Sequence, residues 1–316
     1  MDTLTKVLRA RRGASALTYG LLVGLISVTA LVSVTSIGDN TDALFGTVDE
    51  NLSGVAGTSG TASASPAPSA SPSPVPCTAT ISGGTNVDLA SQLISPCSWD
   101  GSSALFAEVT LAGTFTSAST SQPAVVVDFP SGSDITLLVT GTVQGAGGAG
   151  GAGGWQSDND GEAGGNGGPA LELRSDASIN NSGAIWGGGG GGGGGGTAHL
   201  PNFYAGGAGG GGGAGSIPGA AGIANPVQYA IYALGFSGNA GGASTGGSGG
   251  ASSSYGGYFS GAGGSGGGPG LPGATGGNGT GAFSGPGGAG GSAGDGVLEN
   301  GGIANWISQG DVRPAP

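Results

Sequence analysis

Basic residues, histidine and cysteine are all scarce in this chain of 316 residues. Beyond residue 13 it has 17 acidic residues but only two basic ones, Arg174 and Arg313. Phosphate groups are bound by Lys and Arg, so this composition excludes nucleic acid and anionic membrane surfaces as partners. His199 is the sole histidine, and the residues assemble no acid–base or nucleophile set around it. We therefore expect no enzymatic activity and no cofactor.

Long apolar runs are absent with one exception. Residues 14–37 carry no charge, and a helix of that length can cross roughly 30 Å of hydrocarbon. The basic residues that precede this run keep residues 1–13 cytoplasmic and direct the remainder outward. They are Lys6, Arg9, Arg11 and Arg12. We expect an N-terminal hydrophobic α-helix in the bacterial inner membrane, with the rest of the chain exported.

The order of residues around this run resembles that of Flp-type (type IVb, tight-adherence) pilins. The matching positions are Gly13-Ala14, Tyr19-Gly20 and the end of the run at 37–40, and the similarity spans residues 7–52. The resemblance implies processing between Gly13 and Ala14, assembly with other pilin subunits, and a final place in a pilus or at the cell surface. Thr18 stands where the family usually has Glu, which indicates a minor subunit. A plain membrane anchor is the alternative.

The two cysteines of an exported chain are expected to pair. A Cys77–Cys97 disulfide would close a loop of about 20 residues and stabilise the fold by roughly 3 kcal/mol. A metal site is the less favoured interpretation, because the only histidine is distant in sequence.

The composition divides the chain into six segments. Pro, Ser and Ala dominate residues 53–76, a linker that we expect to be a semi-rigid spacer. Alternating apolar residues between 104 and 143 predict short strands, arranged as a small sandwich or as a few solenoid layers. The predicted order is a leader at 1–13, a pilin-like transmembrane helix at 14–52, the linker at 53–76, a small disulfide-stapled all-β domain at 77–144, a glycine-rich module at 145–302, and a C-terminal strand and tail at 303–316.

Glycine dominates the second half of the chain. Residues 145–300 hold 62 of the 79 glycines, without the strict Gly-X-Y period of collagen. A disordered tract is one interpretation, because glycine loses the most entropy on folding. The interpretation we favour is a polyglycine-II-like module, in which three-residue-per-turn helices lie side by side and hydrogen-bond laterally. Each position facing a neighbouring helix must then be Gly.

The step Asn180-Asn181-Ser182-Gly183-Ala184-Ile185, followed by ten glycines at 187–196, resembles the glycine-rich receptor-recognition tips of bacteriophage tail fibres. The similarity extends over residues 125–313. It implies a sandwich of polyglycine helices with variable loops at one end that grip a cell-surface receptor.

Aromatic residues between the glycine runs are candidates for that contact. Tyrosine offers a large contact area at low entropic cost, whereas a packing role would only fill gaps. The predicted receptor-binding residues are Phe203, Tyr204, Tyr229, Tyr232, Tyr255, Tyr258 and Phe259. Phe236 and Phe283 are expected near the same loops.

Two further motifs are only weak indications of a metal site or of catalysis. Asp158, Asp160 and Glu162 offer carboxylates for a calcium ion, although the interpretation we favour is a solvated acidic turn. Gly242-Ala243-Ser244-Thr245-Gly246 fits the nucleophile-elbow pattern of serine hydrolases by chance, since no strand–helix context surrounds it.

The sequence therefore predicts a minor pilin-like surface subunit with an adhesive glycine-rich module that binds a cell-surface or glycan receptor. The alternative is a structural glycine-rich surface protein on a plain membrane anchor.

Overall fold

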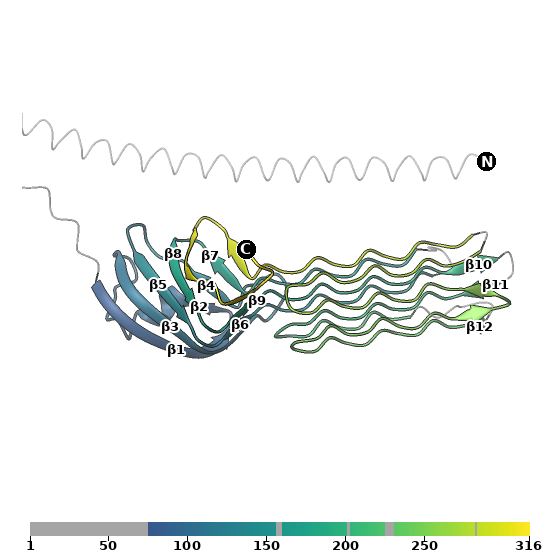
Figure 1. The fold of residues 1–316 in the computed structure, drawn as a ribbon, viewed down its shortest axis with the longest axis horizontal. Helices are drawn as coiled ribbons and strands as arrows, with labels where there is room; N and C mark the ends of the chain where they lie inside the picture. Colours follow the sequence, from purple (N-terminus) through teal and green to yellow (C-terminus); the bar gives the residue numbers. More distant parts are fainter. Residues whose placement is uncertain (1–74, 156–159, 201–202, 225–230, 282) are drawn as a thin grey trace, which may run out of the picture. The chain divides into compact units, whose positions relative to one another are not determined.

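The computed structural model describes residues 75–155, 160–200, 203–224, 231–281 and 283–316 (Figure 1). The predicted leader, apolar helix and nearly all of the predicted linker lie outside these residues. The described part of the chain contains a curled parallel β-solenoid and a set of extended glycine-rich segments that leave it on one side (Figure 1).

Five layers of parallel strands make up the solenoid. Each layer contributes to a long, bent sheet, and the first four also contribute to a shorter second sheet. The layers follow one another in the order of the chain. The first is β1 (Val75–Thr85) with β2 (Val87–Asp88), and the second is β3 (Leu105–Thr116) with β4 (Val125–Val127). The third is β5 (Asp134–Val139), β6 (Thr142–Gln144) and β7 (Leu171–Leu173). The fourth is β8 (Ala177–Asn181), β9 (Ala184–Trp186) and β15 (Val297–Glu299), and the last is β16 (Ala304–Ser308) with β17 (Asp311–Arg313).

The apolar pattern of the strands explains their placement. In β3, Leu105, Ala107, Val109 and Leu111 are buried while Phe106 is half exposed, so one face packs inward and the other remains open. Burying one such aliphatic side chain contributes about 1.5–3 kcal/mol. The largest fully buried side chains are Phe115, Leu89, Leu93, Leu105, Leu111, Ile135, Leu137, Leu171, Leu173, Ile179, Ile185 and Val109.

A column of glycines marks the bend of the long sheet. A Cβ on Gly113 would lie 1.9 Å from the Ser82 carbonyl oxygen, and one on Gly141 would lie 2.0 Å from the Gly113 oxygen. One on Gly183 would lie 2.1 Å from the Gly141 oxygen. Each layer therefore needs a glycine where it crosses the layer before it.

The first layer is covered by α2 (Leu89–Leu93), whose Leu89 and Leu93 are fully buried. The Asp88 side chain accepts a hydrogen bond from the Ala90 amide at 3.2 Å and caps this helix. A Cys77–Cys97 disulfide joins β1 to the segment after α2, with the Cα atoms 5.4 Å apart. The predicted disulfide is thus confirmed.

Ten glycine-rich segments of the described residues run beside one another, and we name them PG1 to PG10. Their backbone hydrogen bonds repeat every three residues, as in a polyproline II helix, and join different segments. They are PG1 (145–154), PG2 (161–168), PG3 (187–196), PG4 (206–215), PG5 (217–224), PG6 (234–242), PG7 (246–252), PG8 (260–268), PG9 (271–279) and PG10 (285–295).

PG3 lies at the centre of this polyglycine lattice. Its amides donate in turn to PG2, PG4 and PG9, and its carbonyls accept from PG10, PG1 and PG8. It therefore has six neighbours and no face that a side chain could occupy. A Cβ on Gly188 would lie 1.8 Å from the Ala146 oxygen, and one on Gly193 would lie 1.9 Å from the Gly288 oxygen. This geometry accounts for ten consecutive glycines at 187–196.

PG4 is the second interior helix. It donates to PG1, PG6 and PG8 and accepts from PG3, PG5 and PG7. Its two alanines, Ala208 and Ala214, are fully buried. The other eight segments surround this pair and carry nearly all the remaining side chains of the lattice.

The predicted fold class is wrong for the described part of the chain. The strands do not form a small all-β domain that precedes a separate glycine-rich module. PG1 and PG2 are inserted between β6 and β7, and PG3 to PG10 between β9 and β15, so that the solenoid is built from strands before, between and after the glycine runs. Among the described residues α2 is the only α-helix, and none of these residues forms a helix long and apolar enough to cross a membrane. The helix predicted at 14–52 lies outside them.

Candidate functional site

The polyglycine lattice presents loops at the end away from the solenoid. The chain runs outward in PG1, PG3, PG5, PG7 and PG9 and returns in the segment that follows each one. The described residues between these pairs of segments therefore share the far end: 155 and 160, 197–200, 203–205, 231–233, 253–260, 280–281 and 283–284. Figure 1 shows β10 (Ala198–Leu200), β11 (Phe203–Ala205) and β12 (Ile231–Ala233) there, opposite the sheets.

The turns at the near end are anchored to the solenoid. Ser216, between PG4 and PG5, donates through its Oγ to the Ser117 carbonyl at 3.1 Å. The Gln144 side-chain amide donates to the Ala243 carbonyl at 2.5 Å. The motif at Gly242–Gly246 is one of these near turns, in which the Gly242 amide donates to the Thr245 carbonyl at 2.7 Å. It is not the strand-to-helix elbow of a hydrolase.

Two short strands form a tyrosine hairpin at the far end, comprising residues 253–260. β13 (Ser254–Tyr255) pairs antiparallel with β14 (Tyr258–Phe259). Gly256 and Gly257 join them with φ of 59° and 85°, the backbone that a two-residue type I′ turn requires. A Cβ on either glycine would meet nothing within 4 Å, so the tip of the hairpin projects into open space.

Hydrogen bonds hold the hairpin to its neighbours. At its base, the Ser253 amide donates to Ser260 Oγ at 2.9 Å, and the Ser260 amide donates to the Ser253 carbonyl at 2.8 Å. On its flank, the Phe259 amide donates to Thr280 Oγ1 at 2.7 Å, and the Thr280 amide returns a bond to the Phe259 carbonyl at 2.8 Å. The hairpin and the 280–284 loop are therefore joined.

The tyrosines of the hairpin are accessible. Tyr255 and Tyr258 are directly opposite in the strand register, which places both rings on one face of the hairpin. Their exposed fractions are 41% and 38%, and that of Phe259 is 52%. An exposed aromatic group on a fixed backbone is an arrangement typical of a binding surface.

The other predicted contact residues are at the same end. Phe203 and Tyr204 belong to β11 and Tyr232 belongs to β12, while Tyr229 lies outside the described residues. The structure thus brings the described candidates to one end of the lattice. Their role in binding remains a prediction.

Two exposed aromatic residues complete this end. Trp155, 40% exposed, follows PG1 directly and was not among the predicted loop residues. Its position at the end of a glycine run is the signal that could have identified it. Phe283, 55% exposed, lies between PG9 and PG10 as expected, whereas Phe236 is an exposed residue of PG6 itself.

The calcium candidates are only partly described. Asp158 lies outside the described residues, and Asp160 and Glu162 flank the start of PG2. Over the ranges that the structure covers, no three His, Cys, Asp or Glu side chains gather in a way that could hold a metal ion. The calcium site remains a prediction.

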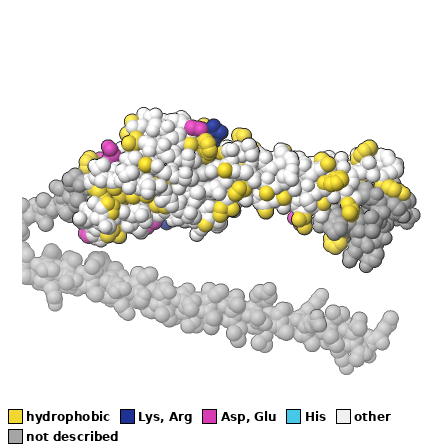
Figure 2. Space-filling model, turned by 90° about the horizontal axis from the view of Figure 1, so that it is seen from below, with side chains coloured by type: hydrophobic (Ala, Val, Ile, Leu, Met, Phe, Trp, Pro, Cys, Tyr) yellow, Lys and Arg dark blue, Asp and Glu magenta, His cyan; other side chains and the backbone are white. Residues whose placement is uncertain are grey.

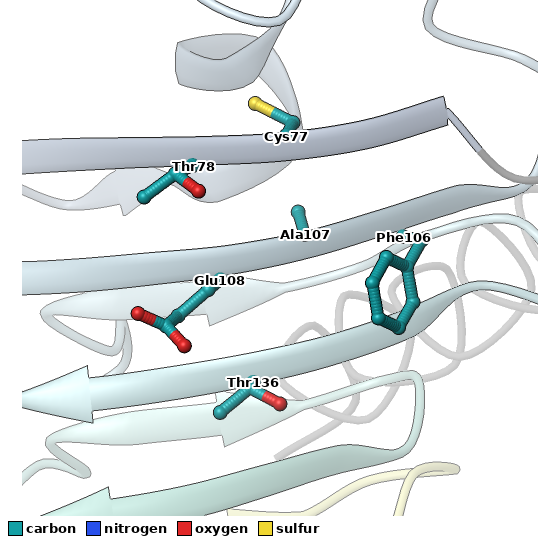
Figure 3. Close-up of a pocket in the computed structure, with 6 residues that line it drawn as sticks. All are labelled: Cys77, Thr78, Phe106, Ala107, Glu108 and Thr136. Atoms are coloured by element: carbon teal, nitrogen blue, oxygen red, sulfur yellow. The ribbon is translucent and has the colours of Figure 1, made fainter.

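The solenoid offers a shallow cavity on its open face. It has a volume of about 320 Å³ and is lined from β1, β3 and β5 (Figure 3). Thr78, Phe106, Glu108 and Thr136 carry the polar and aromatic groups at this cavity. Glu108 is the only ionisable side chain that lines it, because Cys77 is disulfide-bonded, so the cavity offers no acid–base pair for catalysis.

One buried carboxylate belongs to the second sheet. Glu172 is 5% exposed and accepts hydrogen bonds from Arg174 Nε at 2.8 Å and from the Asn300 side chain at 2.7 Å. The guanidinium of Arg174 lowers the pKa of the Glu172 carboxyl below its usual value, against the opposing effect of burial. This cluster lies in the solenoid, away from the far end. Figure 2 shows that charged side chains are sparse on the visible face of the molecule.

Comparisons with known proteins give a family and a related structure. The sequence profile of the family "Phage tail fibre adhesin Gp38" matches residues 76–315. Among solved structures, the gp37–gp38 adhesin tip complex of the bacteriophage S16 long tail fibre is similar, with 24% identity and a TM-score of 0.43 over 74% of this chain and 79% of that one. No curated protein matches the chain. The resemblance to phage tail fibre tips is thereby confirmed at the level of the family.

The family match corrects one prediction from the sequence and leaves another without support. It overturns the predicted location in the bacterial inner membrane and then in a pilus, because the matched family consists of phage tail fibre adhesins. It also gives no support to a pilin-like subunit that assembles with other pilins. The residues that carry the pilin resemblance, 7–52, lie outside the described part of the chain.

Proposed function

The chain belongs to the phage tail fibre adhesin Gp38 family, and on this premise we propose that residues 75–316 are an extracellular receptor-binding adhesin module. In this proposal the far-end loops of the polyglycine lattice contact a cell surface, and the solenoid is the base from which they project. The role is binding without covalent chemistry.

The observation that carries this proposal is the separation of the two ends. The described chain enters at β1 and leaves after β17, and both strands belong to the solenoid (Figure 1). The exposed aromatic residues Trp155, Tyr255, Tyr258, Phe259 and Phe283 are instead at the far end. Both ends of the described chain therefore lie at the base, opposite the loops that we propose to contact a receptor.

The lattice suits this task because it fixes the loops in space. Every outward segment is hydrogen-bonded to its neighbours at three-residue intervals, so each loop starts and ends on a rigid support. Rigid presentation reduces the ordering cost of binding. A passive spacer would need neither aromatic loops nor hydrogen bonds between them, such as those from Phe259 to Thr280.

Adsorption of the labelled full chain to a panel of bacterial strains tests the proposal. We expect adsorption to a responsive strain to fall at least tenfold when five aromatic residues are jointly replaced by Ser: Trp155, Tyr255, Tyr258, Phe259 and Phe283. This corresponds to a loss of about 1.4 kcal/mol or more in binding free energy, as for the loss of a hot spot. The matched control replaces exposed residues of the solenoid (Phe106, Ile303 and Ile307) by Ser and should retain adsorption. Equal adsorption by both variants would refute the role of the far end.

A further inference from the structure

We propose that the tyrosine hairpin binds an uncharged sugar unit of a cell-surface glycan. This inference rests on the proposed adhesin function and specifies the chemistry of its receptor. It is argued from three features of the hairpin: the paired rings, the absence of cationic groups, and the small size of the contact.

The paired rings match the shape of a pyranose. Tyr255 and Tyr258 share one face of the hairpin and are each about two-fifths exposed. A sugar ring has an apolar face of C–H groups that packs on an aromatic ring, whose face is electron-rich. Each phenol can also donate or accept a hydrogen bond at a sugar hydroxyl. A tyrosine pair therefore offers both kinds of contact that a sugar needs.

The hairpin is also organised before any ligand arrives. Gly256 and Gly257 set the turn, and Ser253 and Ser260 tie its base at 2.8–2.9 Å. Thr280 joins it to the adjacent loop. Because these bonds fix the backbone from which both tyrosines project, binding needs to order little more than the side chains.

The charge of the region selects against acidic sugars. The far-end loops contain no Lys or Arg in sequence, and the two basic residues beyond residue 13, Arg174 and Arg313, both belong to the solenoid. Sialic acids, uronic acids and phosphorylated sugars carry negative charges, which proteins usually bind with Arg or Lys. The chain has a net charge of −12, which would repel them further. A neutral hexose unit is the ligand that this surface fits.

The contact that the hairpin alone offers has the size of a sugar unit. Two tyrosines supply at most about 500 Å² of contact, since an aromatic side chain buries roughly 150–250 Å². A stable protein–protein interface needs about 800 Å² from each partner. A contact of this size binds a single sugar weakly, and repetition of the sugar along a glycan and of the adhesin on its carrier would raise the avidity.

An oligosaccharide array probed with the labelled full chain tests this inference. We expect binding to neutral oligosaccharides, at least tenfold weaker binding to their acidic counterparts, and at least a tenfold loss of neutral binding in the Tyr255→Ala/Tyr258→Ala variant. Tyr255→Phe/Tyr258→Phe keeps the rings and should retain part of the signal. Phe106→Ala, an exposed aromatic residue of the solenoid, is the matched control and should bind like the wild type. Equal melting temperatures would show that the variants are folded.

Adsorption to cells treated with periodate or with proteinase K distinguishes failure of this inference from failure of the adhesin proposal. Periodate cleaves the vicinal diols of sugars, whereas proteinase K removes surface proteins. We expect periodate to abolish adsorption to a responsive strain and proteinase K to spare it. If adsorption needs the far-end aromatic residues but survives periodate and is lost with proteinase K, the adhesin role stands and the sugar assignment is wrong. Preferential binding to acidic sugars, or binding unaffected by loss of both tyrosines, would also overturn it.

Discussion

In the solenoid, buried side chains fill the space between two sheets, whereas in the polyglycine lattice the backbones themselves are in contact. Leu137 and Ile179 contribute apolar area to the solenoid core, and each is fully buried. The ten residues of PG3 contribute no side chain at all, and their amides and carbonyls are bonded to six neighbouring segments. The stability of the solenoid is therefore lowered when a buried side chain becomes smaller. The stability of the lattice is lowered when a glycine gains a side chain.

The two regions also differ in the source of their stability. Hydrophobic burial acts per side chain and tolerates local change. A backbone hydrogen bond contributes only about 0.5–1.5 kcal/mol net, while an ordered glycine loses more entropy than any other residue. A glycine helix on its own would therefore not be stable. It is stable within the lattice because neighbouring segments form hydrogen bonds with its amides and carbonyls on every side.

The largest effect is expected from a methyl group in the lattice centre. In Gly191→Ala the new Cβ would lie 1.9 Å from the Ala149 oxygen, and backbone cannot move aside as a flexible side chain can. We expect a loss of more than about 3 kcal/mol in the free energy of unfolding, measured by chemical denaturation. The control is Gly268→Ala in PG8, where the only neighbouring atom is a Leu271 methyl at 3.6 Å. A Gly191→Ala protein as stable as the wild type would contradict the close backbone contact at this position.

Removal of a buried side chain should destabilise the solenoid. Leu137→Ala removes a side chain that is 0% exposed and leaves a cavity between the sheets. We expect a loss of about 2–5 kcal/mol, measured in the same denaturation experiment. Ile307→Ala, at a position 63% exposed on β16, should change stability by no more than about 0.5 kcal/mol. Similar losses in the two variants would show that this core is not closely packed.

A smaller effect is expected from the buried carboxylate, and it should depend on pH. Because the folded state lowers the pKa of Glu172 from 4.5, its ionised form stabilises the fold above that pH and the contribution is lost as pH falls through the folded-state pKa. Glu172→Gln should lower the free energy of unfolding by about 1–2 kcal/mol at pH 7. We expect a value near the lower end, because the Arg174 side chain is 46% exposed and solvent screens the ion pair.

Denaturation curves between pH 2 and pH 7 measure this dependence. The stability of the wild type should fall in acid more steeply than that of Glu172→Gln. Glu108→Gln, which changes an exposed carboxylate on the same solenoid, serves as the control. Parallel curves for the wild type and Glu172→Gln would mean that this ion pair does not contribute.

The sequence predicted individual features better than their arrangement. The disulfide could be predicted because an exported chain with two cysteines has one obvious pairing. Lateral packing of glycine helices followed from the scarcity of side chains in 145–300. The division into a β domain and a later module failed, because parallel pairing joins strands far apart in sequence, such as β7 to β15. No local pattern encodes which strand lies beside which.

The candidate site shows the same limit. The alternation of glycine runs with aromatic residues located the loops, since a ring cannot occupy the lattice interior. Sequence alone did not show that Tyr255 and Tyr258 would share one face, which depends on the two-residue turn at Gly256 and Gly257. The prediction from sequence also missed Trp155, a single aromatic residue beside a polar stretch, although it stands at the end of the first glycine run.

The regular reversal of direction along PG1 to PG10 has a consequence for how such a protein can change. Every excursion ends where it began, at the solenoid, so each far-end loop is bounded by its own outgoing and returning helix. A loop can grow, shrink or exchange its residues without displacing the two helices beneath it, provided that those helices keep their glycines. The architecture therefore confines the strict requirement for glycine to the lattice and leaves the composition of the loops unconstrained by it.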